Sequence, residues 1–142
     1  MDERNVTGNI VDYYENEQLK FRYSLIDGRL HGDASEFFNN GTVKVKKNYI
    51  FGKLFGQYTA YWPNGEARLK MDIKNNTYGF GERVENLQIS YKAGKKLKDK
   101  GEAKLVFYGA DGKEMRSSEN LAIKDQFSFK IFQESKEIYP NQ

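Results

Sequence analysis

The chain of 142 residues contains no cysteine, a single histidine and a single tryptophan. Disulfides and thiolate metal sites are therefore excluded, and His31 alone cannot supply a multi-histidine metal site. No apolar run approaches the ~18 residues that a membrane-spanning helix requires. The opening residues 1–8, MDERNVTG, do not have the pattern expected of a signal peptide. The compartment stays open between the cytoplasm and export after removal of a leader.

The sequence also lacks the motifs that usually accompany catalysis. It has no Ser-His-acid order, no phosphate-binding glycine loop before a helix and no cluster of metal ligands. The carboxylates that could approach one another as a general acid–base pair are Asp33, Glu36, Asp72 and Glu82. No spacing in the sequence brings any two of them together. We therefore expect a protein that is not an enzyme and that uses no cofactor or metal.

Aromatic and charged residues are abundant instead. Ten Tyr and ten Phe raise the aromatic share to 15%, while hydrophobic residues of all types make up only 38%, against nearly half in a typical globular domain. Large amphipathic rings suit a thin layer with much surface better than a thick core. The 23 basic and 20 acidic residues leave a net charge of +3, and this balance argues against nucleic acid as the partner.

One pattern recurs three times at a spacing of 24 residues, beginning at Gly8, Gly32 and Gly56. The aromatic pairs that follow are Tyr13-Tyr14, Phe37-Phe38 and Tyr61-Trp62, and the turns contain Asn16-Glu17, Asn40-Gly41 and Asn64-Gly65. Second turns are expected at Asp27-Gly28, Phe51-Gly52 and Asn75-Asn76. Glu17 stands where the other copies have glycine, so we expect a strained or differently shaped first turn.

Alternating apolar and polar residues fill the segments 19–25, 43–49 and 67–73. A period of two predicts half-buried strands, and the intervening turns predict hairpins. The expected fold is all-β: an antiparallel meander of tandem hairpins, forming an elongated twisted sheet. We expect one domain over residues 1–142, with regular repeats at 8–79, degenerate hairpins and a cap at 80–132, and a frayed tail at 133–142.

The order of glycine, aromatic pair and Asn-Gly, followed by Gly-basic-Leu-x-Gly, resembles the variant MORN repeat family of bacteria. The segments that carry it are Tyr13–Asn16, Gly28–Gly32, Phe37–Gly41, Gly52–Gly56 and Tyr61–Gly65. The resemblance is close over residues 8–79 and weak over 80–132. It implies the hairpin meander and offers no catalytic motif. Many such proteins are labelled YwqK-family antitoxins, which implies a toxin as partner, whereas better-known MORN proteins are scaffolds and some are linked to acidic phospholipids.

A two-residue loop at Asn40-Gly41 would pair Phe38 with Val43, Phe37 with Lys44 and Ser35 with Lys46. One face of the sheet would then collect Tyr14, Leu19, Phe21, Leu25, Phe38, Val43, Val45, Tyr49, Trp62, Leu69, Met71 and Ile73. Asp12 and Glu36 also fall on this apolar face, either at a solvated rim or in a groove. Since a sheet cannot leave its apolar face in water, the C-terminal part, a curl of the sheet or a second molecule has to cover it.

The opposite face is the candidate binding surface. It would collect Tyr13, Lys20, Arg22, Phe37, Lys44, Lys46, Tyr61, Arg68 and Lys70. Six cations beside an aromatic row suit an acidic partner and cation–π contacts. The alternative is a solvated strand face, where Lys and Arg keep a sheet soluble and block edge pairing. The run Lys92–Lys100 is either a second basic patch or a solvated loop.

Three classes of function are compatible with these features. The first is a protein-binding module, which the resemblance would make a toxin-neutralising one. The second is a peripheral protein that binds anionic lipid or another polyanion through the same cations. The third is a structural repeat that self-associates through an uncovered apolar face.

Overall fold

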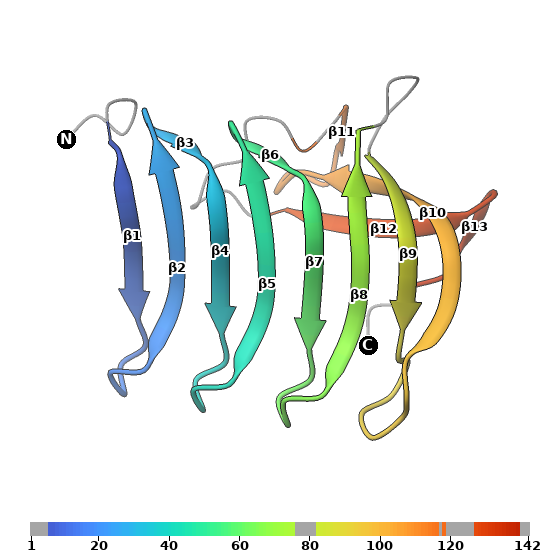
Figure 1. Ribbon diagram of the computed structural model, residues 1–142, viewed down its shortest axis with the longest axis horizontal. Coiled ribbons are helices and arrows are strands. Elements are labelled where there is room, and N and C mark those ends of the chain that lie inside the picture. The colour runs from blue at the N-terminus through green and yellow to red at the C-terminus, as the bar shows by residue number, and fades with distance from the viewer. Residues whose placement is uncertain (1–5, 76–81, 117, 119–126, 140–142) are drawn as a thin grey trace.

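The computed structural model describes residues 6–75, 82–116, 118 and 127–139. In these ranges the chain forms one open, twisted sheet of thirteen antiparallel strands and no helix (Figure 1), which confirms the all-β antiparallel prediction. The strands are β1 (Gly8–Tyr13), β2 (Leu19–Ile26), β3 (Arg29–Leu30), β4 (Gly32–Phe37), β5 (Val43–Ile50), β6 (Lys53–Leu54), β7 (Gly56–Tyr61), β8 (Ala67–Lys74), β9 (Glu82–Ile89), β10 (Lys98–Tyr108), β11 (Glu114–Met115), β12 (Ser128–Gln133) and β13 (Lys136–Glu137).

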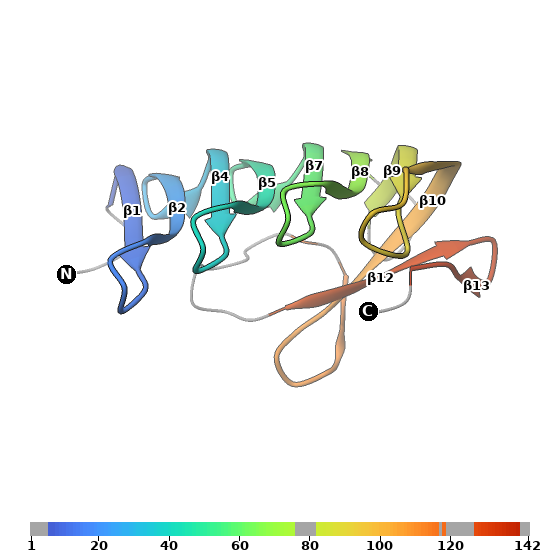
Figure 2. The same cartoon turned by 90° about the horizontal axis from the view of Figure 1, so that it is seen from below.

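The long strands follow one another across the sheet in chain order. The order is β1-β2-β4-β5-β7-β8-β9-β10-β12-β13, while the short strands β3, β6 and β11 pair with β2, β5 and β10. The strands β1 to β8 stand side by side in one row (Figure 1). Strand β10 bends away from the row, so that β12 crosses beneath it (Figure 2). We call the face of the row turned toward β12 the inner face, and the opposite one the outer face.

Four hairpin loops share one hydrogen-bond pattern. In the loop after β4, the Gly41 N–H donates to the Phe38 carbonyl at 3.0 Å, and the Phe38 N–H donates to the Thr42 carbonyl at 2.8 Å. The Asn40 side chain accepts from the Thr42 N–H at 2.9 Å. The same backbone pair closes the loops that begin at Tyr14, Trp62 and Gly109.

The fourth residue of each of these loops needs a positive φ. Gly41, Gly65 and Gly112 have φ of 89°, 90° and 79°, and Glu17 adopts 70° at the equivalent place. A residue with a side chain is strained there. The strain expected for the first loop is therefore present, whereas its hydrogen bonds match those of the glycine loops.

The second set of turns also lies where the sequence places it. Asp27-Gly28 has φ of 49° and 78°, and Phe51-Gly52 has φ of 43° and 86°. Positive φ at both central residues is the signature of the two-residue I′ turn that suits a twisted hairpin. The third predicted turn includes Asn76, which lies outside the described residues.

The register between β4 and β5 departs from the prediction near the loop. Ser35 lies opposite Lys46 as expected, but Phe37 lies opposite Val43, because residues 38–42 all belong to the connection. Lys44 is therefore an extra residue with no partner across the ladder, which makes it a β-bulge. Equivalent bulges fall at Lys20 in β2 and Arg68 in β8.

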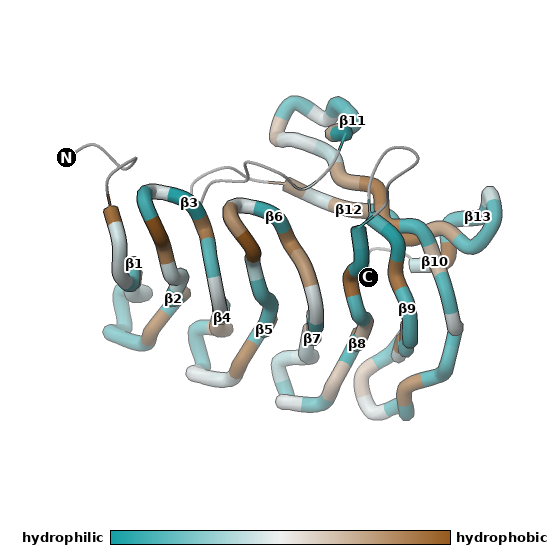
Figure 3. Tube along the Cα trace, turned by 45° about the horizontal axis from the view of Figure 1, so that its top comes forward, coloured by the Kyte–Doolittle hydropathy of each residue, from teal (hydrophilic) through white to brown (hydrophobic). Residues whose placement is uncertain are grey.

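The core lies between the inner face of the row and the C-terminal strands. Beyond the bulges, every second residue of β2, β5 and β8 is buried or half-buried in it. Figure 3 colours the hydrophobic residues along these strands brown. The C-terminal half contributes the fully buried Leu87, Ile89, Leu105, Phe107 and Ile131. Of the three covers considered for the apolar face, the curl of the sheet and the C-terminal strands supply it.

The C-terminal strands correct one prediction. The strands β9, β10 and β12 fall within residues 80–132, where degenerate hairpins and a cap are expected, while residues 119–126 of that segment lie outside the described residues. The frayed tail at 133–142 is wrong as far as Tyr139. There β13 pairs with β12, the Ile138 N–H donates to the Ile131 carbonyl at 2.9 Å, and Tyr139 is buried.

Candidate functional site

The cations of the predicted binding face divide into two sets. Lys20, Lys44 and Arg68 occupy the bulges, so they leave the alternation of their strands. Lys44 and Arg68 consequently line a pocket on the inner side of the sheet, together with Val45 and Leu69. The prediction of one face for all six cations is therefore wrong, because it rests on a two-residue loop that the chain does not form.

Each bulge cation lies over an aromatic ring of its own hairpin. The Lys20 ammonium is 5.6 Å from the centre of the Tyr14 ring, and that of Lys44 is 5.9 Å from Phe38. The Arg68 guanidinium is 4.7 Å from Trp62. Cation–π contact was expected with the neighbouring rings Tyr13, Phe37 and Tyr61. The bulge shifts it by one residue, so these cations hold the loop ring in place.

The other three cations form a straight row across the outer face. Register pairs link Arg22 to Ser35, Ser35 to Lys46, Lys46 to Thr59 and Thr59 to Lys70. Arg22, Lys46 and Lys70 are exposed, and within the described ranges none of them forms an ion pair. One strand lies between successive cations, so their backbones are two inter-strand spacings, or about 10 Å, apart. We call Arg22, Lys46 and Lys70 the outer cation row.

A second row of the outer face is acidic or carries amides. Asp33 pairs with Asn48, Gln57 with Asp72, and Asp72 with Glu85. Asp33, Asn48, Gln57 and Asp72 lie two positions along their strands from the outer cation row, so the face carries a basic stripe beside an acidic one. Glu85 continues the second row on β9, where it forms an ion pair with Arg83 at 3.2 Å. Between the stripes is a shallow depression of about 550 Å³, lined by Arg22, Asp33, Ser35, Lys46, Gln57 and Thr59 among others.

The three predicted site aromatics differ in exposure. Tyr13 is 57% exposed on the edge strand β1, whereas Phe37 and Tyr61 are half-buried. The Phe37 carbonyl accepts a 2.6 Å hydrogen bond from the Tyr14 hydroxyl of the preceding hairpin. Tyr61 lines both the outer depression and the inner pocket. These rings therefore do not form one continuous aromatic stripe beside the outer cation row.

A buried ion pair lies on the inner face. The Lys47 ammonium is 2.6 Å from Oε2 of Glu36, and the Tyr23 hydroxyl donates to the same oxygen at 2.9 Å. Only 3% of the Lys47 side chain is exposed, against 29% of Glu36. Of the two places expected for acidic residues on the apolar face, Glu36 thus occupies the groove. Asp12 occupies the rim, where it is exposed and accepts a hydrogen bond from the Tyr13 N–H.

Aromatic rings surround the Lys47 ammonium on its other sides. It lies 5.2 Å from the centre of Tyr23, 5.7 Å from Tyr49 and 5.4 Å from Phe127. Phe127 precedes β12, so Lys47 connects the row of strands to the C-terminal segment. A cation in such surroundings gains quadrupole attraction that partly offsets its lost hydration.

The charges of the pair stabilise each other. Burial alone would raise the pKa of the Glu36 carboxyl, but the charge and hydrogen bond of Lys47 outweigh it and the pKa is lowered. Burial likewise opposes the charged form of Lys47, yet the Tyr58 phenol and the Glu36 carboxylate raise the pKa of its ammonium. Both groups are therefore ionised at neutral pH. A lysine with a raised pKa is not a candidate amine nucleophile.

The sequence holds a signal for this pair. Positions 24 residues before and after Lys47 carry Tyr23 and Met71, so an ammonium replaces an apolar or amphipathic side chain at an inward position. Glu36 stands where the next copy has Ala60 and the preceding copy has Asp12. Opposite charges at inward positions of adjacent strands indicate a pair. Glu36 is expected on the apolar face from the sequence, whereas Lys47 is not among the predicted site residues.

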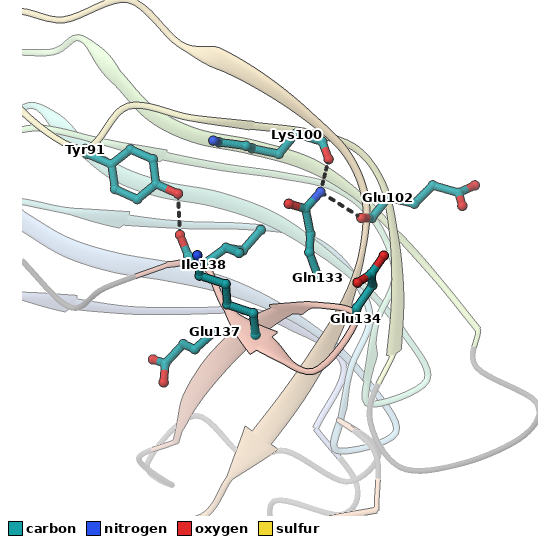
Figure 4. Close-up of a pocket in the computed structure, with 8 residues that line it drawn as sticks. Tyr91, Lys100, Glu102, Gln133, Glu134, Glu137 and Ile138 are labelled. Atoms are coloured by element: carbon teal, nitrogen blue, oxygen red, sulfur yellow. Dashed lines mark hydrogen bonds between the residues drawn. The ribbon is translucent and has the colours of Figure 1, made fainter.

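The lysine run Lys92–Lys100 occupies the β9–β10 loop and the start of β10, where four of its five lysines are exposed and Lys100 is half-buried. Beside it a cleft of about 1010 Å³ is lined by Tyr91, Lys100 and residues of the C-terminal hairpin (Figure 4). The Tyr91 hydroxyl donates to the Ile138 carbonyl, and the Gln133 amide donates to the Lys100 carbonyl. These contacts fasten β12–β13 to the sheet and present no convergent functional groups.

The remaining candidates do not assemble into a site. Among the described residues, no three His, Cys, Asp or Glu side chains gather where they could hold a metal ion. No helix in the same ranges is long and apolar enough to cross a membrane. His31 accepts from the Phe51 N–H at 3.1 Å through Nδ1 and packs on the Phe51 ring, so it has a structural role in its connector.

The carboxylates considered as acid–base partners also lie apart in the fold. Asp33 and Asp72 belong to the outer acidic stripe, whereas Glu36 belongs to the inner ion pair. Glu82 is fully buried at the start of β9, where its Oε1 accepts from the Ser118 N–H at 2.9 Å.

Comparison with known proteins found no matching family model, no matching curated protein and no matching solved structure.

Proposed function

We propose that the chain is a non-enzymatic binding module whose outer face takes up an acidic partner protein. The observation that carries the proposal is the outer cation row. Arg22, Lys46 and Lys70 are exposed at one height of the sheet, and Ser35 and Thr59 lie between them. Hydroxyl groups between regularly spaced cations suit hydrogen bonding to carboxylates as well as charge attraction.

The outer cation row follows from the 24-residue period of the sequence. Loops, bulges and cations recur every 24 residues, which supports an interpretation of residues 8–75 as tandem hairpins of the MORN-like kind. Each hairpin adds two strands and one outward cation at the same height. A module of this design gains binding surface by adding copies, in the manner of other repeat proteins.

The acidic stripe favours a protein over a membrane surface. Asp33 and Asp72 lie beside the cations, and an anionic bilayer would repel them. A protein surface can match two stripes of opposite charge, which contributes specificity and a fast association rate. A toxin is the partner class that the resemblance to antitoxins implies. Anionic lipid is the alternative partner, and binding assays with an acidic peptide and with anionic vesicles distinguish the two.

The test uses a fluorescein-labelled decaglutamate peptide as an acidic polypeptide probe. Arg22→Glu, Lys46→Glu and Lys70→Glu are combined in one variant, and Lys92→Glu, Lys95→Glu and Lys96→Glu form a control with the same change in net charge. We expect anisotropy to report at least about tenfold weaker binding for the first variant, since about 1.4 kcal/mol is lost, and little change for the control. Binding should weaken as salt rises.

Equal loss in both variants would mean that net charge alone attracts the peptide, and would overturn the assignment to this face. Sedimentation with phosphatidylserine vesicles completes the test. Vesicle binding that depends on the outer cation row, without peptide binding, would replace the protein partner by a lipid surface.

A further inference from the structure

Strand β1 forms one end of the sheet and leaves a backbone edge without a partner strand. It pairs with β2 on one side, and among the described residues no strand lies on its other side (Figure 1). All of its residues except Ile10 are exposed. An edge of this kind presents N–H and C=O groups that can pair with a strand of another chain.

The alternation of the backbone decides which groups face this edge. The Tyr14 N–H donates to the Gln18 carbonyl at 2.8 Å, so the backbone groups of Tyr14 point toward β2. Neighbouring residues of an antiparallel strand direct their backbone groups to opposite sides. Those of Asn9, Val11 and Tyr13 therefore point toward the free edge.

The two ends of the sheet differ in how they are protected against pairing. At the C-terminal end, β13 has only two residues, Lys136 and Glu137, both charged and exposed. Short, charged edge strands discourage association. Strand β1 has six residues with no lysine and no proline. Its only charge is Asp12, whose carboxylate accepts a hydrogen bond from the Tyr13 N–H at 2.9 Å. The sequence thus blocks one edge and leaves the other open.

The exposed side chains of β1 are complementary to a second copy of the same strand. Val11 is 45% exposed and Tyr13 is 57% exposed, and both lie on the outer face. In an antiparallel pair centred on Val11, the two valines face each other and each tyrosine faces Asn9 of the other copy. Apolar side chains that are in water in a single chain would then contact one another across the strands.

We infer that two copies of the chain pair through β1 into a symmetric dimer with one continuous sheet. A two-fold axis perpendicular to the sheet at Val11 makes the strands antiparallel and keeps both outer faces on one side. The two Val11 residues exchange backbone hydrogen bonds, and the Asn9 N–H donates to the Tyr13 carbonyl of the second copy. Asp12 lies opposite Ile10 in this register, so the two carboxylates do not face each other.

The dimer extends the outer cation row. Val11 lies opposite Arg22, so the axis is in line with Arg22, Lys46 and Lys70. The rows of the two copies therefore join end to end across the paired β1 strands. This consequence for binding rests on the proposed function of the row, whereas the dimer itself does not.

Sedimentation equilibrium of the chain without any peptide tests the dimer. As the protein concentration increases, the average mass should rise from that of one chain toward twice that value. Val11→Lys places two ammonium groups opposite each other and should raise the dissociation constant of the dimer about tenfold. Ile50→Lys is the matched control, because Ile50 is 43% exposed and belongs to β5 inside the sheet, and it should leave the constant unchanged.

A mixture of two variants tests the register. Val11→Lys and Val11→Glu should each dissociate, and their equimolar mixture should recover the dimer, because the axis places the ammonium opposite the carboxylate. Recovery would also show that both variants are folded. A natural chain that stays monomeric, an equal loss in Ile50→Lys, or a mixture that does not associate would each overturn the inference. Failure of the peptide experiment on the outer face leaves these measurements unaffected.

Discussion

The Lys47 ammonium and the Glu36 carboxylate lie 2.6 Å apart on the face of the sheet that buries its apolar residues. The neighbouring copies of the pattern have Tyr23 and Met71 in place of the lysine. In this copy a charged pair thus replaces apolar packing. Its contribution to stability can be measured by substituting Lys47 and Glu36 with the residues of the next copy, Met and Ala.

Replacing only one residue of the ion pair should lower the free energy of unfolding more than replacing both. Lys47→Met leaves the carboxylate of Glu36 without its cation, and we expect it to lower the free energy of unfolding by roughly 2–3 kcal/mol, less than for a fully buried charge. Adding Glu36→Ala recreates Met71 and Ala60 of the next copy and should recover most of the loss. Urea denaturation followed by Trp62 fluorescence gives both values. A double variant no more stable than Lys47→Met would contradict the pairing.

The pair also predicts a loss of stability in acid. The folded state lowers the pKa of Glu36 below its ordinary value of 4.5, because Lys47 outweighs the effect of burial. The stabilisation is therefore complete above that value and is lost as pH falls through the lowered pKa, since the unfolded chain takes up the proton first. Denaturation at pH 3 to 7 should show a steeper decline for the natural chain than for Glu36→Gln. Parallel curves would contradict this.

Glu82 predicts the opposite dependence. Burial raises the pKa of its carboxyl, although the hydrogen bonds from Ser118 act in the other direction. Stability is favoured below the ordinary value of 4.5 and falls as pH rises through the raised pKa, because the unfolded chain ionises first. Glu82→Gln keeps the acceptor for Ser118 and should flatten this part of the profile. The gain of the variant over the natural chain should grow from pH 4 to pH 7 in the same denaturation assay.

The first hairpin loop can be improved by one substitution. Glu17 has a φ of 70° with the same loop hydrogen bonds as Gly65, whose φ is 90°. Glu17→Gly should therefore raise the free energy of unfolding by about 0.5–1 kcal/mol. Gly65→Ala is the reciprocal change at a position with open space around it, so it tests backbone strain alone and should destabilise by about 1 kcal/mol or more. Thermal unfolding by circular dichroism measures both.

Much of this fold could be predicted because its signals are local. The alternation in residues 43–49 and the Asp27-Gly28 and Phe51-Gly52 turns depend on neighbouring residues alone, and the structure places strands and turns there. The register beyond each loop could not be predicted, because Asn40-Gly41 is compatible with a two-residue turn and with a longer loop followed by a bulge. That single ambiguity decides on which side Lys44 lies.

The site was harder to predict because it depends on contacts between distant parts of the chain. The outer cation row follows from the 24-residue repeat, so Arg22, Lys46 and Lys70 could be predicted from the sequence. The pocket on the inner side of the sheet requires Phe129 and Tyr139 to lie beneath the row of strands. No local sequence signal in residues 127–139 specifies that β12 crosses the row. The bend of β10 that causes it lies in the least periodic part of the chain.

NMR mapping with the decaglutamate peptide shows whether the outer cation row is the binding surface. We expect the largest amide shifts at Arg22, Ser35, Lys46, Thr59 and Lys70, with none on the inner face. Shifts concentrated in the Lys92–Lys100 loop, or spread evenly over all exposed lysines, would contradict it.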